Sequence, residues 1–152
     1  MNSFEFTDST VEAELKEHGV YVSVTKGASM YPLFKTNRDV IILKRPEENP
    51  KKYDVVLYKA RSDKYILHRI VKVLEDKYVI RGDNTYVLEY IAKERIIGVL
   101  TEFTRKGRKR TVSSFGFRFY SRFWNFIYPI RFVFHKIRSF AYSIYRKLFK
   151  RK

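Results

Sequence analysis

Between residues 20 and 103 the chain alternates short β-branched and aromatic runs with turn-forming residues, and no other feature limits the fold as much. Residues 20–25 read Val-Tyr-Val-Ser-Val-Thr, a period-two pattern typical of a half-buried strand. Further strands are expected at residues 40–43, 55–58, 65–73, 78–81 and 96–103. Residues 61–63 and 75–76 suit hairpin turns, and residues 46–50 suit a loop. Many short strands with brief connections predict a mainly-β body.

A short helix is expected ahead of these strands. Ser9 and Glu12 have the spacing of a capping box, and Gly19 can end the helix in a left-handed conformation. The expected organisation is an N-terminal helix over residues 1–19, a β domain over residues 20–104 and a C-terminal helical tail over residues 105–152.

Charge divides the chain at the same boundary. Residues 1–102 hold 17 basic and all 16 acidic residues, whereas residues 103–152 hold 15 basic residues, no acidic ones and 15 of the 26 aromatics. Because 45% of the residues are apolar and only four are proline, a disordered acidic or proline-rich chain is excluded. The absence of cysteine excludes disulfide frameworks and thiolate metal sites.

The sequence gives no sign of export or of a membrane span. The first 19 residues lack the basic and apolar regions of a secretory signal. No stretch approaches the ~18 uncharged apolar residues that a spanning helix needs. We therefore expect the protein on the cytoplasmic side of the membrane.

Three short segments of the body carry chemistry. Ser29 follows the small residues Gly27 and Ala28, where a nucleophilic hydroxyl could be exposed near backbone N–H groups. His68 lies within an apolar strand, and Asp83 follows Gly82 in a turn-like segment. Taken singly, each also fits a structural role: a loop serine, a packed histidine and a turn.

In this order, Ser29-Met30-Tyr31-Pro32, His68-Arg69-Ile70 and Gly82-Asp83-Asn84 resemble the motif series of the signal peptidase I superfamily, which includes LexA-type repressor peptidases. The resemblance covers roughly residues 20–104. It implies the β-fold of that superfamily and serine endopeptidase activity without a metal or other cofactor.

The resemblance also implies roles for individual residues. Ser29 falls on the nucleophile, and His68 falls where the endoplasmic-reticulum and archaeal type places a histidine base. Asp83 would orient His68, with Glu89 as the alternative. The chemistry is consistent, because an imidazole can take the serine proton near neutral pH while a carboxylate fixes its tautomer.

The tail predicts two basic amphipathic helices separated at Pro129. Arg118, Arg122 and Asn125 share one face of the first. In the second, an apolar stripe at residues 133, 137, 140 and 144 lies opposite basic residues. Such helices suit an anionic membrane surface. Packing on the body or on another subunit is the second interpretation, and binding of nucleic acid the third.

The sequence therefore predicts a serine endopeptidase that cleaves a leader, signal or precursor peptide and is held peripherally at the cytoplasmic membrane face. The competing hypothesis is an inactive peptidase-fold adaptor that binds membrane or protein partners. The oligomeric state is left open.

Overall fold

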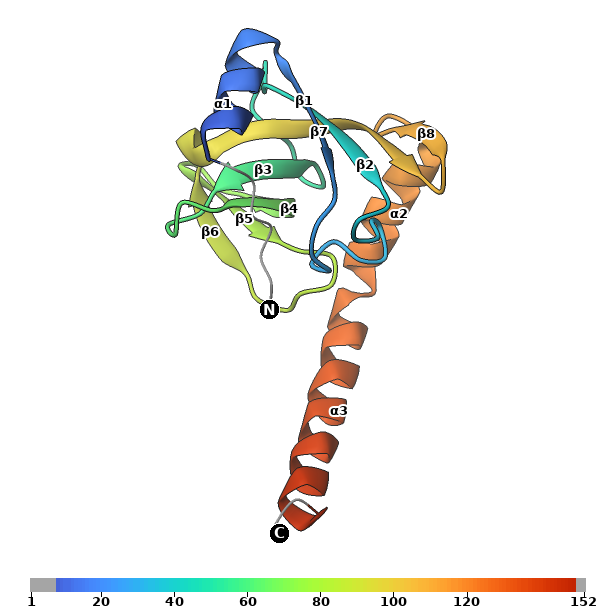
Figure 1. Ribbon diagram of the computed structural model, residues 1–152. Coiled ribbons are helices and arrows are strands. Elements are labelled where there is room, and N and C mark those ends of the chain that lie inside the picture. Colours follow the sequence, from blue (N-terminus) through green and yellow to red (C-terminus); the bar gives the residue numbers. More distant parts are fainter. Residues whose placement is uncertain (1–7, 150–152) are drawn as a thin grey trace.

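The computed structural model describes residues 8–149, and within them the strands form a single antiparallel sheet (Figure 1). The strands are β1 (Val20–Val24), β2 (Val40–Lys44), β3 (Val55–Lys59), β4 (Tyr65–Val73), β5 (Lys77–Arg81), β6 (Glu89–Ala92), β7 (Ile96–Arg105) and β8 (Arg108–Thr111). Their order is β1-β2-β7-β3-β4-β5-β6, and β8 pairs with β7. The expected mainly-β class is confirmed.

The sequence pattern did not predict two of the strands, β6 and β8. β6 is a short strand of mixed polarity that pairs with β5. In β8 every residue is exposed, so the strand has no apolar side to reveal it. Its hairpin turns at Lys106 and Gly107, both with positive φ, as a two-residue type I′ turn requires. The sheet thus continues beyond residue 104, where the sequence predicts the tail to begin.

The sheet buries both of its faces at β3 and β4. One face of β3 and β4 presents Val55, Leu57 and Leu67 to the larger core cluster. The opposite face presents Val56 and Tyr58 to a second, smaller cluster. Successive residues of a strand point to opposite faces. Neighbours on β4 therefore enter different environments, and this alternation decides the arrangement of the site.

Helix α1 (Asp8–Glu17) packs at one end of the sheet. It begins at Asp8 in the described part of the chain, so Ser9 lies inside the helix and the expected capping position is wrong. Gly19 has a φ of 68° and follows the end of α1, as expected for a left-handed stop. A 3-10 turn, η1 (Lys93–Arg95), joins β6 to β7.

The tail forms helices α2 (Phe115–Phe126) and α3 (Tyr128–Phe149). The hydroxyl of Ser114 caps α2 by accepting from the Phe117 N–H. Pro129 stands in the first turn of α3, where its missing N–H costs nothing. Figure 1 shows α3 extending away from the sheet. None of the helices in residues 8–149 has the length and apolar character needed to cross a bilayer.

Candidate functional site

His68 lies on β4 with one ring nitrogen against a carboxylate. Its Nδ1 is 3.0 Å from Glu89 Oε1, and Glu89 stands at the start of β6. The Tyr58 hydroxyl donates to the other oxygen, Glu89 Oε2, at 2.8 Å. The hydrogen bond from His68 lowers the pKa of Glu89, and the bond from Tyr58 adds to the effect. An ionised Glu89 requires hydrogen on Nδ1, so Nε2 of a neutral His68 is the acceptor.

Tyr58 is a fixed donor in this arrangement. Burial raises the pKa of its hydroxyl, and the negative charge of Glu89 raises it further. The hydroxyl therefore stays protonated and keeps the Glu89 carboxylate in place. Sequence reasoning missed this residue, because a tyrosine within an apolar strand is typical of a core position.

Ser29 lies in the connection between β1 and β2, beside the segment that follows β5. The Asn84 N–H donates to the Ser29 carbonyl at 2.7 Å, and the Asn84 side chain donates to the Ala28 carbonyl at 3.2 Å. Ser29 itself is half-buried. Backbone hydrogen bonds thus tie the serine loop to the Gly82-Asp83-Asn84 segment, which we call the GDN segment.

Gly82 lies next to both the Ser29 carbonyl and the ring of His68. A Cβ added there would lie 2.7 Å from the Ser29 carbonyl oxygen and 3.0 Å from His68 Nε2. Any larger residue would push the two apart, which explains the glycine physically. The Ser29 carbonyl and His68 Nε2 therefore both lie beside Gly82.

The side chains of Ser29 and His68 are not hydrogen-bonded to each other. Within residues 8–149, the hydroxyl of Ser29 makes no hydrogen bond to His68; the bonds at Ser29 are those of its main chain. Such bonds in free enzymes are often long and tighten when substrate binds.

Asp83 is placed differently from the sequence expectation. Its two carboxylate oxygens accept from Arg69 Nε and from a second Arg69 nitrogen, each at 2.8 Å, and both side chains are sealed from solvent. The carboxylate that contacts His68 is that of Glu89. The expectation that Asp83 orients His68 is therefore wrong. The Asp83 carboxylate is bound by Arg69, whose side chain lies on the opposite face of β4 from His68. The alternative, Glu89, contacts His68 instead.

Residues of the tail also reach the GDN segment. Tyr120 OH donates to Asp83 Oδ2 at 3.0 Å, and Trp124 Nε1 donates to the Asp83 carbonyl at 2.9 Å. From α3, Arg131 donates to the same carbonyl at 2.9 Å. Packing on the body, the second interpretation of the tail, is thus observed for α2 and the first two turns of α3. The helical spacing of Tyr120 and Trp124 is the sequence signal that could have suggested a shared contact.

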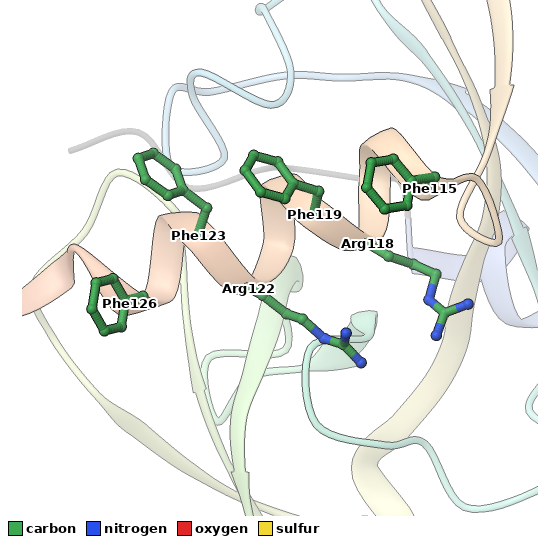
Figure 2. Close-up of a pocket in the computed structure, with 6 residues that line it drawn as sticks. All are labelled: Phe115, Arg118, Phe119, Arg122, Phe123 and Phe126. Carbon is green, nitrogen blue, oxygen red and sulfur yellow. The ribbon is translucent and has the colours of Figure 1, made fainter.

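The opposite face of α2 is exposed and strongly apolar. Phe115, Phe119, Phe123 and Phe126 are 47% to 84% exposed. With Arg118 and Arg122 they line a groove of about 510 Å³ (Figure 2). Consecutive rings of Phe115, Phe119 and Phe123 stack with centroids 6.2 and 5.8 Å apart. Asn125 does not share this face, because its side-chain oxygen accepts from Arg81 on the body.

The outward side of α3 repeats this pattern. Val133, Ile137, Phe140 and Ile144 are all exposed, whereas Arg131 and His135, opposite them, contact the body. His135 stacks on Tyr86 with ring centroids 4.2 Å apart. The helix therefore turns Arg131 and His135 toward the body and its apolar stripe outward.

In the part of the chain described, no group of three His, Asp or Glu side chains is arranged to hold a metal ion. The comparison with known proteins adds no assignment: no protein-family model matches the chain, and no curated protein matches it significantly.

Proposed function

We propose that the protein is a serine endopeptidase of the signal peptidase type that cleaves a leader, signal or precursor peptide at a membrane surface. One observation carries the proposal: Glu89 holds His68 by Nδ1, while Nε2 faces the Gly82 position that adjoins Ser29. A base oriented by a carboxylate next to a loop serine is the arrangement that nucleophilic hydrolysis requires.

The chain's own residues account for each proton. Ser29 Oγ attacks the peptide carbonyl carbon and gives its proton to His68 Nε2, forming an imidazolium that Glu89 stabilises. His68 returns that proton to the leaving amine as the C–N bond breaks, which leaves an acyl ester on Ser29. Water then attacks the ester while His68 accepts a water proton, and the proton passes back to Ser29 as the acid departs.

The sheet offers an edge for an extended substrate close to this serine. β1 is an end strand of the sheet and leads directly into the loop of Ser29. Val22 and Val24 of β1 are exposed. A peptide that adds a strand along β1 would gain main-chain hydrogen bonds and arrive with its backbone near Ser29.

The tail supplies the membrane part of the proposal. The phenylalanine face of α2 carries Arg118 and Arg122 beside its rings, and residues 103–152 contain no acidic residue. Rings that enter the headgroup boundary and guanidinium groups that meet anionic lipid are complementary to such a surface.

A fluorophosphonate serine probe tests the peptidase. We expect wild type to be labelled and Ser29→Ala to lose the label, because the probe reacts with an activated serine hydroxyl. Ser62→Ala, an exposed serine in the turn between β3 and β4, is the matched control and should label normally. An unlabelled wild type, or a labelled Ser29→Ala, would overturn the proposal and favour the adaptor.

Sedimentation with vesicles tests the membrane part separately. We expect binding to anionic vesicles, little binding to neutral ones, and a roughly tenfold weaker affinity when Phe119 and Phe123 are both replaced by alanine. Exchanging Val73, an exposed apolar residue at the end of β4, for alanine should change nothing. Tight RNA binding without any lipid dependence would contradict this assignment.

A further inference from the structure

The GDN segment connects the nucleophile to the base. A Cβ added at Gly82 would lie 2.7 Å from the Ser29 carbonyl oxygen and 3.0 Å from His68 Nε2, and Asn84 donates two hydrogen bonds into the loop of Ser29. Since the main chain of Ser29 and the ring of His68 both adjoin this segment, a shift of a few tenths of an ångström in it changes their separation. Activity of this kind is sensitive to such displacements.

Residues of the tail donate hydrogen bonds to Asp83, the middle residue of that segment. The Asp83 carbonyl accepts from Trp124 on α2 and from Arg131 on α3, each at 2.9 Å. The Asp83 carboxylate accepts from Tyr120 at 3.0 Å. Three donors of the tail thus converge on one buried residue and fix its main chain as well as its side chain.

Helix α2 also contacts the buried ion pair between Arg69 and Asp83. Buried Arg69 donates to Ser121 Oγ on α2 at 2.7 Å, in addition to its two bonds to Asp83. The guanidinium also lies over the rings of Phe117 and Tyr120. A buried ion pair is stable only when its remaining donors and acceptors are satisfied. Displacing α2 would therefore disturb Asp83 from two sides.

A third contact links the start of the segment to the tail. The Arg81 guanidinium, at the end of β5, lies 3.3 Å over the ring of Tyr128 and donates to Asn125 at 2.9 Å. The GDN segment is consequently held at its entrance and at its centre by residues that lie outside the predicted peptidase domain.

We propose that α2 and the first turn of α3 are a positioning element of the active site, in which Trp124 and Arg131 hold the GDN segment so that Ser29 and His68 stay in register. Neither residue touches the reacting atoms; both act through Asp83. The inference rests on the proposed function and adds to it: the tail takes part in catalysis besides locating the protein.

Trp124→Phe is the direct test. The exchange keeps an aromatic ring for the contacts with Tyr120 and Arg131 and removes only the N–H that binds the Asp83 carbonyl. We expect the rate constant of Ser29 labelling to fall about three- to tenfold, at unchanged affinity for the probe. The matched control is Tyr142→Phe, which removes a hydroxyl from an exposed aromatic residue of α3 and should label at the wild-type rate.

Arg131 supplies a graded second test. Arg131→Met removes the donor to the Asp83 carbonyl, whereas Arg131→Lys keeps a cationic donor on a similar stem. We expect the methionine variant to be slow and the lysine variant to recover a large part of the rate. If Arg131 acted through its charge alone, the methionine variant would approach the wild-type rate at high salt.

Ring ¹⁵N spectra of His68 separate this inference from the proposed function. The chain has only three histidines, so the signals can be assigned. We expect Trp124→Phe to move the His68 Nε2 signal and Tyr142→Phe to leave it in place, even if wild type proves inert to the probe. Folded Trp124→Phe with wild-type labelling and unmoved His68 signals would overturn the inference.

Discussion

Two neighbouring residues of β4 hold two different carboxylates, and the contrast between them explains the site. Arg69 pairs with Asp83 in a contact closed to solvent. His68 pairs with Glu89, whose side chain is 31% exposed. The two pairs lie on opposite faces of the sheet, because His68 is in register with Val56 of the smaller core cluster and Arg69 with Val55 of the larger one.

The difference in exposure assigns different work to the two pairs. Arg69 and Asp83 are closed to solvent and bonded to Ser121 and Tyr120, so this pair serves to hold structure. His68 is buried as well, but its partner Glu89 is partly exposed, and His68 Nε2 faces the Gly82 position beside Ser29. The proposed acid–base site uses the second pair, supported by the first.

The largest expected effect comes from breaking the solvent-inaccessible pair of Arg69 and Asp83. Arg69→Met leaves Asp83 buried without its partner, and we expect a loss of about 3–5 kcal/mol in the free energy of unfolding. Urea denaturation measures it. Lys51→Met removes a cation from an exposed pair with Glu48 and should leave the stability close to wild type, because surface pairs contribute little. Equal stability of both variants would contradict the contrast.

The next effect concerns the open pair. In Glu89→Gln the side-chain amide can donate to His68 Nδ1, which favours the tautomer with hydrogen on Nε2 and removes the acceptor for the serine proton. We expect probe labelling of Ser29 to fall by about 10²–10⁴-fold with only a small change in stability. A Glu89→Gln variant that labels as fast as wild type would return the orienting role to another residue.

The pH dependence of the labelling rate tests the same pair of His68 and Glu89. A protonated imidazole cannot accept the serine proton, so labelling by wild type should decrease as the pH is lowered. A labelling rate that does not change with pH would exclude a histidine base. Measuring protein unfolding at each pH separates loss of the base from loss of the fold.

The smallest effect is on stability at acid pH. The folded-state pKa of Glu89 lies below its ordinary value of 4.5, chiefly because of the hydrogen bond from His68. Its stabilising contribution is therefore complete above pH 4.5 and is lost as the pH falls through the lower folded value. We expect the unfolding free energy of Glu89→Gln to decline less steeply below pH 4.5 than that of wild type.

Much of the body could be predicted from residue patterns. The apolar runs of β2, β3, β4 and β7 are long and β-branched, and each forms within two residues of its expected ends. Prediction failed where pairing, not composition, makes the strand. β8 is basic and exposed, and it exists because a tight hairpin returns it to β7.

By itself, the sequence determined the mainly-β class, the separation of charge, and the order of Ser29, His68 and the GDN segment. These follow from local propensity and from counting. Only the tertiary structure decided that Glu89 rather than Asp83 meets His68, and that the tail carries donors for Asp83. The reason is geometric: alternation sends His68 and Arg69 to opposite faces of the sheet, and a helix folded from residues more than thirty positions further along the chain covers the Arg69 face.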